Sequence, residues 1–145
     1  MESITNKRAY YDYEILEKFE AGIALLGFEV KSIKNGRINL SGSYVIVKNN
    51  EAWLLGSDIP PYQPQNTPKN YDSKRTRKLL LKRQEIRELA GKIQEKNLTL
   101  VPLKVYTKNH KIKLEIGLAR SRKKADKREL IKKREDKREM RKAKK

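Results

Sequence analysis

The sequence predicts a mainly β protein, built as a small antiparallel β-barrel with flanking helices and followed by a basic C-terminal tail. Two observations predict the body. Several short segments alternate apolar and polar residues and are joined by hairpin signals, and only two segments have a helical period. The strand–helix–strand rhythm of a parallel sheet is missing from the sequence. A third observation, a sharp rise in basic residues near the C-terminus, predicts the tail.

The first third of the body contains a strand and a short helix. Residues Tyr13 to Glu17 alternate roughly between apolar and charged side chains, as strands do. Residues Phe28 to Lys34 are a candidate helix. Gly36 is its expected C-terminal stop, because glycine adopts the left-handed conformation that ends many helices.

The next two segments predict a hairpin. Ser43 to Val47 and Ala52 to Leu55 are rich in Tyr, Val, Ile and Trp, which favour strands. Asn49 and Asn50 lie between them, and asparagine tolerates the positive φ that a two-residue hairpin turn requires.

A long irregular segment, Pro60 to Thr76, follows the hairpin and contains four prolines. Loops of this length inside a compact domain are usually functional or disordered. Its basic end contains Lys74, Arg75, Arg77 and Lys78. Two interpretations of these residues are equally consistent with the sequence: a loop that contacts phosphates, and a loop that is only solvated.

The second half predicts a helix and two strands. In Lys82 to Lys96, residues Ile86, Leu89, Ala90 and Ile93 lie on one helical face, so we expect that face in the core, with Asn97 as a C-terminal cap. In Leu98 to Tyr106, the apolar residues move from one face of the expected strand to the other. Leu98 and Leu100 share one face, and Leu103 and Val105 share the other. This predicts a bulge or a break in the strand at Pro102.

The last predicted strand is Lys111 to Ala119, which has the cleanest alternation in the chain. Ile112, Leu114, Ile116 and Leu118 point one way, and charged residues point the other way. Asn109 and His110 are expected in the turn before it.

Charge divides the chain into a body, 1–119, and a tail, 120–145. The tail has 15 Lys and Arg against 5 Asp and Glu, whereas the body has 21 against 13. Its few large apolar residues form no stripe, so we expect it to be disordered in the free protein. A positive charge of this density favours a polyanionic partner, with a solvated tail as the alternative.

The composition excludes several other classes. Cysteine is absent and histidine occurs once, which removes disulfides, thiolate metal sites and most imidazole chemistry. The sequence shows neither a signal peptide nor a membrane-spanning segment, so we expect a cytoplasmic protein without a membrane partner. Among small barrels, the oligonucleotide-binding type is the one most often paired with a basic surface.

No motif for covalent chemistry, a cofactor or a small-molecule substrate is present, and we expect no enzymatic activity. Glu20 and Glu29 are candidates for base recognition, because a carboxylate can accept hydrogen bonds from base amines; salt bridging is the alternative. Tyr10 and Tyr11 are candidates for stacking on unpaired bases, whereas Tyr13 is expected in the core together with Phe19.

Several separate blocks resemble the SsrA-binding protein (small protein B) family, which partners transfer-messenger RNA in bacterial trans-translation. The blocks are Asn6 to Ala9, EAGIALLGFEVKSIKNG at Glu20 to Gly36, SYV at Ser43 to Val45, RTRKLLL at Arg75 to Leu81, Glu85-Ile86, LTLVPL at Leu98 to Leu103, and DKRE at Asp126 to Glu129. They cover nearly the whole chain in the family's order.

The resemblance implies an RNA-binding barrel of the oligonucleotide-binding type that grips the tRNA-like domain of transfer-messenger RNA. It also implies a tail that enters the empty mRNA path of a stalled ribosome, folds there as a helix and contacts small-subunit rRNA near the decoding centre. The implied RNA-binding residues are Asn6, Arg8, Glu20, Glu29, Lys31, Ser32, Arg75, Arg77, Lys78 and Leu80. The implied tail residues are Lys123, Lys124, Asp126, Lys127 and Arg128.

Four positions depart from the family pattern. Ser121 replaces a glycine, and Ala125 replaces the aromatic residue or histidine before the DKR motif. Tyr71 and Ser73 replace a histidine and a proline around the loop aspartate. The alternative interpretations are a ribosomal or rRNA-binding protein of the same barrel class and an RNA-modifying enzyme, for which the sequence has no cofactor motif.

Overall fold

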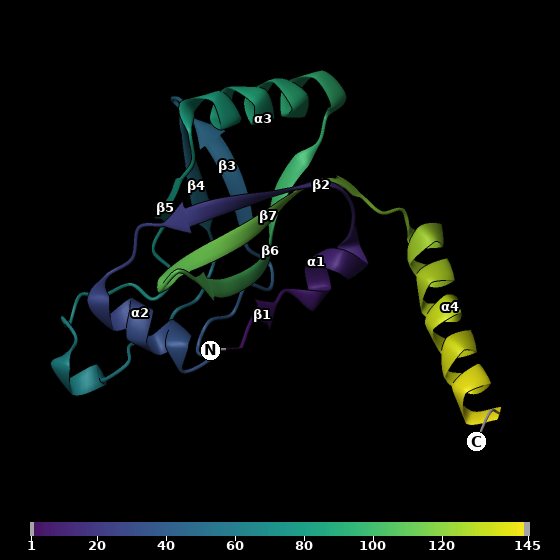
Figure 1. Ribbon diagram of the computed structural model, residues 1–145, viewed down its shortest axis with the longest axis horizontal. Coiled ribbons are helices and arrows are strands. Elements are labelled where there is room, and N and C mark those ends of the chain that lie inside the picture. Colours follow the sequence, from purple (N-terminus) through teal and green to yellow (C-terminus); the bar gives the residue numbers. More distant parts are fainter. Residues whose placement is uncertain (1, 144–145) are drawn as a thin grey trace.

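The computed structural model describes residues 2–143 of the chain. Its strands form one antiparallel sheet in the order β1-β6-β3-β4-β5-β2-β7, and β7 also pairs with β6, so the sheet closes into a ring of strands (Figure 1). The strands are β1 (Ile4–Thr5), β2 (Tyr13–Ile23), β3 (Tyr44–Lys48), β4 (Glu51–Leu55), β5 (Arg77–Leu80), β6 (Thr99–Lys108) and β7 (Lys111–Ser121). The predicted antiparallel β fold with flanking helices is confirmed.

The helices lie around this ring. They are α1 (Lys7–Asp12), α2 (Gly27–Lys34), α3 (Arg83–Lys96) and α4 (Lys124–Ala143), with a short 3-10 turn at Pro64–Asn66. In Figure 1, α3 lies across one end of the ring, α2 and the long loop lie at the other end, and α4 leads away from the body. The sequence predicted α2 and α3. It missed α1, whose six residues are too few to show a helical period.

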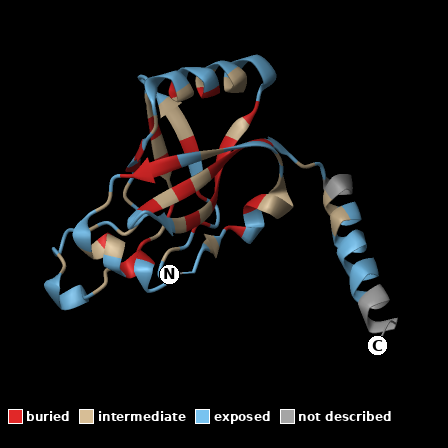
Figure 2. Ribbon diagram, viewed as in Figure 1, coloured by how far each residue is buried: buried red, intermediate tan, exposed pale blue. Residues whose placement is uncertain are grey.

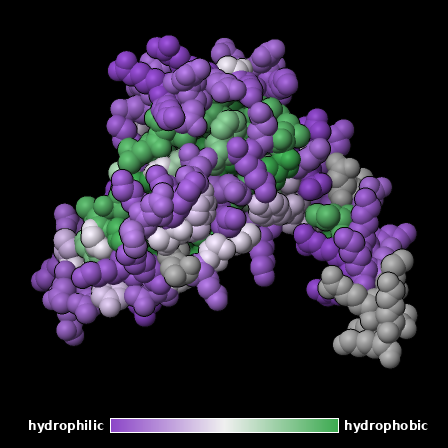
Figure 3. All heavy atoms as spheres, viewed as in Figure 1, coloured by the Kyte–Doolittle hydropathy of each residue, from purple (hydrophilic) through white to green (hydrophobic). Residues whose placement is uncertain are grey.

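The main core fills the ring and the space under α2 and α3. The alternating apolar residues of β7, namely Ile112, Leu114, Ile116 and Leu118, are buried and all belong to it, as their alternation predicted. Ile33 of α2 and Leu89 of α3 are fully buried in the same cluster. Figure 2 shows this burial on the inward sides of the helices, and in Figure 3 apolar atoms are visible below α3. One core therefore positions both helices.

A second, smaller core joins α1 to the outside of the sheet. Ala9 packs there on Val101, Leu103 and Ala119. Gly117 permits this approach, because a Cβ at that position would lie 2.8 Å from the side chain of Leu103. The α1 segment is thus held against β6 and β7.

The bulge predicted at Pro102 is confirmed, because the β6–β7 register shifts between Pro102 and Lys104. The prediction that Leu103 and Val105 share a face is wrong. Leu103 packs in the small core and Val105 in the main core, because the bulge reverses the direction of the side chains between them.

The predicted turns are also found. Positive φ values occur at Asn49, Asn50, Asn97, Asn109 and His110, so the β3–β4 turn, the α3 cap and the β6–β7 turn have the expected residues. Residues 60–76 form an irregular loop as predicted, apart from the short 3-10 turn. Of the basic residues at its end, Arg77 and Lys78 begin β5, a strand that the sequence analysis did not predict.

The boundary between body and tail lies slightly later than the charge pattern indicated. Strand β7 continues to Ser121, which pairs with Tyr13 of β2, and α4 begins at Lys124. The tail is helical in the structure, which is the conformation expected on the ribosome; its disorder in the free protein stays a prediction. No helix in residues 2–143 is long and apolar enough to cross a membrane.

Candidate nucleic-acid interface

A hollow of about 850 Å³ lies between the start of α3, the β3–β4 turn and the outer side of strands β5, β2 and β7. Its charged lining residues are Glu20, Glu51, Lys78, Lys82, Arg83, Glu85, Arg87 and Lys113. Five cations therefore face three carboxylates, which leaves the hollow positive. Three of the predicted RNA-binding residues line it together: Lys78 and Leu80 of β5, and Glu20 of β2, which is distant from them in the sequence.

Leu80 forms an apolar ridge in this surface. Strand β5 turns Leu79 into the core, at 1% exposure, and turns Leu80 outward, at 54% exposure. Leu80 pairs with Gly22 of β2, where an added Cβ would lie 3.2 Å from the Leu80 side chain. On its other side is a second hollow of about 350 Å³, lined also by His110 and Lys111. Leu80 therefore lines both hollows, the first of which is mostly polar and the second more apolar.

Glu20 is the carboxylate beside this ridge. The Tyr106 hydroxyl donates to its Oε2 atom over 2.5 Å, and the Lys108 ammonium lies 3.4 Å from both oxygens. The hydrogen bond from Tyr106, followed by Lys108 and Lys113, lowers the pKa of Glu20 below its ordinary value. The carboxylate is thus ionised at neutral pH, and Oε1 keeps the capacity to accept further hydrogen bonds.

Glu29 lies in a different setting. It occupies the first turn of α2, is fully buried, and accepts hydrogen bonds from Arg75, Arg77, Tyr71 and the Leu26 backbone N–H. The Arg77 guanidinium, also fully buried, donates to Glu29 over 2.7 Å and 3.0 Å. Its remaining N–H groups donate to oxygens of Ser57, Ser73, Arg75 and Tyr71.

The pKa values in this buried cluster follow from its contacts. Burial alone would raise the pKa of Glu29, but the hydrogen bonds from Arg75, Leu26, Arg77 and Tyr71 outweigh it and lower the pKa to about 2. Burial and the bond to Glu29 raise the pKa of Tyr71 to about 12. The cluster therefore joins α2, the long loop and β5 through an ionised pair at neutral pH.

This geometry corrects the RNA-contact prediction for four residues. Glu29, Arg77, Ser32 and Asn6 are buried, so none of them can touch RNA while the fold stays closed. Ser32 donates to the Pro60 carbonyl over 2.6 Å. Any effect of these four side chains on RNA binding passes through the surface that they position.

Asn6 illustrates such a positioning role. Its side-chain oxygen accepts from the Ala9 N–H at the start of α1, and its amide donates to the carbonyls of Leu40 and Pro102. It therefore joins the N-terminal segment to β6 and to the segment before β3.

Arg8, Lys31 and Arg75 remain at the surface. Arg8 is 69% exposed in its side chain and pairs with Asp12 of α1 at 3.2 Å. Lys31 lies 5.9 Å from the centre of the Tyr62 ring. Arg75 is 30% exposed and also bonds to Glu29. They lie outside the two hollows beside Leu80, so the structure does not bring all ten predicted residues into one patch.

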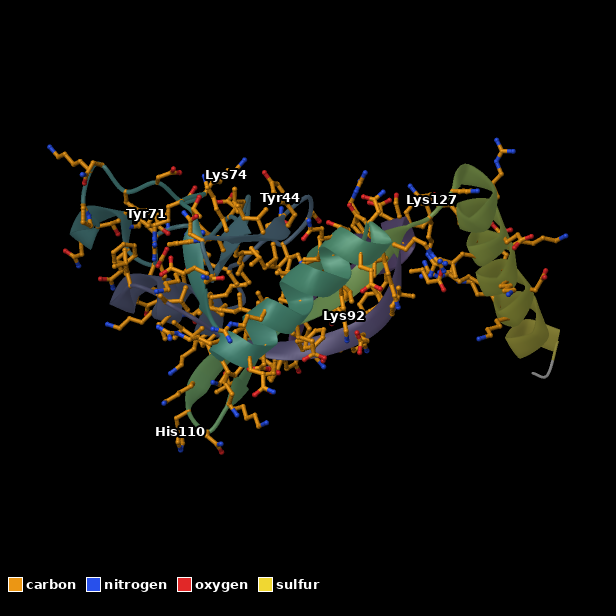
Figure 4. The ribbon with its side chains drawn as sticks, turned by 90° about the horizontal axis from the view of Figure 1, so that it is seen from above. Tyr44, Tyr71, Lys74, Lys92, His110 and Lys127 are labelled. Carbon is orange, nitrogen blue, oxygen red and sulfur yellow. The ribbon has the colours of Figure 1, made fainter. Side chains whose placement is uncertain are left out.

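The start of the tail contacts α1. The Lys127 ammonium lies 3.1 Å from the Asp12 carboxylate and 5.4 Å from the centre of the Tyr11 ring. Figure 4 shows Lys127 between the body and α4. The side chains of Lys124 and Asp126 lie outside the described residues, while Lys123 and Arg128 are exposed. Among the predicted tail residues whose side chains are described, Lys127 thus has ion-pair and ring contacts to α1.

The sequence analysis missed five residues that belong to or adjoin the hollow. They are Lys82, Arg83, Arg87, Lys113 and Tyr106. Lys113 was recognised as an outward residue of its strand, and that outward side is the surface that forms the hollow. Strand β2 pairs with both β5 and β7 and so brings Lys113 of β7 to the same surface as the start of α3. No local signal could have grouped Lys113 and Tyr106 with Lys82, Arg83 and Arg87.

Comparison with known proteins gives consistent matches over nearly the whole chain. The sequence model of the family described as "SmpB protein" matches residues 3–145. The SsrA-binding protein of Thermosynechococcus vestitus is 51% identical over 138 residues, which cover 95% of this chain and 91% of the relative. The SsrA-binding protein of Acaryochloris marina is 54% identical over 138 residues, covering 95% of this chain and 90% of the relative.

A solved structure has the same fold. It is described as "tmRNA-SmpB: a journey to the center of the bacterial ribosome". One of its chains superposes on this chain with a TM-score of 0.69 and 46% sequence identity, over 84% of this chain and 85% of the other.

Proposed function

The chain belongs to the SmpB family of SsrA-binding proteins, and we propose that it binds transfer-messenger RNA and delivers it to stalled ribosomes for trans-translation. It acts as an RNA-binding adaptor and carries out no covalent step itself. In this function the ribosome is its second partner, and the protein acts in the cytoplasm.

The observation that carries the proposal is the hollow beside Leu80. It combines a positive lining, an exposed apolar ridge and an ionised carboxylate in one surface. The cations attract phosphates of any sequence, whereas a carboxylate would repel them and is favourable opposite a hydrogen-bond donor such as a base amine, a base N–H or a ribose 2′-hydroxyl. We therefore assign RNA recognition to the body, with Glu20 as the specific contact and Leu80 as an apolar contact to a base or ribose.

The tail contacts the second partner, the ribosome. Helix α4 is rich in charged residues, and most of its described side chains are exposed, including Ile131 (Figure 2), so the helix gains little stability from packing on its own body. In a channel of rRNA, basic side chains around the whole helix can meet phosphates on every side. We propose that Lys123, Lys124, Lys127 and Arg128 make these contacts in the mRNA path, and that Asp126, in the same segment, contacts rRNA through a hydrogen-bond donor instead of a phosphate.

RNA recognition by the body is tested with two glutamates of strand β2. Glu20→Ala should weaken binding of the tRNA-like domain of transfer-messenger RNA more than binding of random duplex RNA. The matched control is Glu14→Ala, because Glu14 is also exposed and also ion-paired, to Arg120 at 2.8 Å, but lies outside the hollow. Equal losses on both RNAs, measured by gel shift at fixed salt, would reduce Glu20 to a structural role.

The division of labour between body and tail is tested with two further chains. A chain ending at Arg122 keeps all of β7 and should retain most of its affinity for the RNA. Alanine at Asp126, Lys127 and Arg128 together changes the net charge by only −1. We expect this triple variant to bind the RNA almost normally and to lose peptide tagging in a reconstituted stalled-ribosome assay. Near-normal tagging by the triple variant would show that the tail acts only as an electrostatic tether.

A further inference from the structure

The three adjacent strands β2, β7 and β6 bear a chain of polar contacts that ends at Glu20. Strand β7 lies between the other two, and Tyr106 of β6 reaches across it to the Glu20 carboxylate on β2. The Tyr106 ring is itself placed by Lys104, whose ammonium lies 5.4 Å from the ring centre. The contact therefore joins residues that are 86 positions apart in the sequence.

The two oxygens of Glu20 have different surroundings. Oε2 accepts the short bond from Tyr106, and both oxygens lie 3.4 Å from the Lys108 ammonium; for Oε1 this long contact is the one hydrogen bond found among the described residues. The side chain of Glu20 is 38% exposed. A carboxylate has about four sites that can accept a hydrogen bond. Oε1 thus remains accessible, in a group whose other oxygen is fixed.

Fixing one oxygen matters for recognition. A free glutamate rotates about three side-chain bonds, and ordering such a side chain on binding costs about 0.5–1.5 kcal/mol. A side chain that is already held by Tyr106 avoids most of this cost. It also presents its acceptor in one direction, so that an RNA with an amine or N–H at that point is preferred over one with a carbonyl or phosphate.

We propose that Tyr106 is a positioning residue for RNA recognition, which holds the Glu20 carboxylate so that its second oxygen accepts from a base of the bound RNA. This inference rests on the proposed function, in which Glu20 is the specific contact. Tyr106 acts through Glu20, and Lys104 keeps the Tyr106 ring in place.

The test is a double-mutant cycle of Tyr106→Phe and Glu20→Ala. Tyr106→Phe removes only a hydroxyl, and it should weaken binding of the cognate tRNA-like domain about three- to tenfold in the wild-type background. The same change should have no further effect when Glu20 is already alanine. The matched control is Tyr44→Phe, a hydroxyl deletion on an exposed tyrosine of β3 outside the hollow, which should leave the affinity unchanged.

Two outcomes of the cycle overturn the proposal. An equal loss in both backgrounds shows that Tyr106 contacts RNA by itself, and no loss in the wild-type background shows that Glu20 needs no positioning. Thermal unfolding of the four proteins confirms that they are folded.

A second readout works without RNA. NMR titration should show a higher pKa for Glu20 in Tyr106→Phe than in the wild type, because the Tyr106 hydrogen bond is the largest cause of the lowered value. If wild-type protein shows no preference for the cognate RNA, the proposed function fails. If the Glu20 pKa stays the same in the variant, the positioning role fails.

Discussion

Two glutamates of this protein, Glu20 and Glu29, have opposite surroundings although both stand in motifs that resemble the same family. Glu29 is fully buried and bonded to two arginines, and its site joins α2, the long loop and β5. Glu20 lies on the open side of the sheet, with one oxygen held and the other accessible. The comparison teaches that the buried glutamate holds elements of the fold together, whereas the exposed glutamate is the one that a bound RNA could reach, as the proposed function requires. Stability and RNA affinity should therefore respond to different substitutions.

The largest expected effect is on the buried cluster. Glu29→Ala leaves the buried guanidinium of Arg77 without its counter-charge, and breaking a buried pair in this way costs about 3–5 kcal/mol of stability. Urea unfolding followed by circular dichroism measures the loss. Glu20→Ala, whose partners stay in contact with water, should leave the unfolding midpoint nearly unchanged. Similar midpoints for the two variants would remove the distinction between the two sites.

Acid should act on the same cluster. The pKa of Glu29 falls from 4.5 to about 2 on folding, so its contribution to stability is fully present above pH 4.5 and is lost as the pH falls through about 2. The loss is on the order of 3 kcal/mol at 1.36 kcal/mol per pH unit. Arg75→Gln removes one partner and leaves the pKa of Glu29 less depressed, so the acid-dependent loss of stability should be smaller and complete at a higher pH than in the wild type. Identical acid transitions in the two proteins would contradict this.

The next effect separates two neighbouring residues of β5. Leu80→Ala removes an exposed side chain and should weaken binding of the tRNA-like domain by roughly 1–2 kcal/mol, five- to thirtyfold, with little change in stability. Leu79→Ala removes a core side chain and should cost about 2–5 kcal/mol of stability. Gel shifts and urea unfolding of both variants test the contrast. It fails if Leu80→Ala unfolds as easily as Leu79→Ala.

The smallest effect concerns the contact between α1 and the tail. Asp12 pairs with both Arg8 and Lys127, and partly exposed pairs of this kind contribute about 0.2–1 kcal/mol each. Asp12→Asn should therefore barely change global unfolding. It should increase the mobility of the first turn of α4, measured by backbone NMR relaxation. Unchanged relaxation at Lys127 would show that this contact does not hold the tail.

The sequence predicted the local elements well. Alternation placed Ile112, Leu114, Ile116 and Leu118 in the core, and the asparagine pair at Asn49 and Asn50 forms the expected turn. These features depend on neighbours within a few residues, so a local pattern suffices. The six-residue helix α1 and the four-residue strand β5 were missed because they are too short to establish a period.

The sequence by itself determined the strands and their main turns, the family resemblance and the division into a basic body and a more basic tail. It could not separate Glu20 from Glu29, because both are glutamates in motifs that resemble the same family. Only the tertiary structure decided between them. Folding brings Arg75 and Arg77 to Glu29 in the interior, and it brings Tyr106 to Glu20 across the outer side of β7. Burial and partner choice depend on contacts between residues far apart in the chain, and a carboxylate's role follows from both.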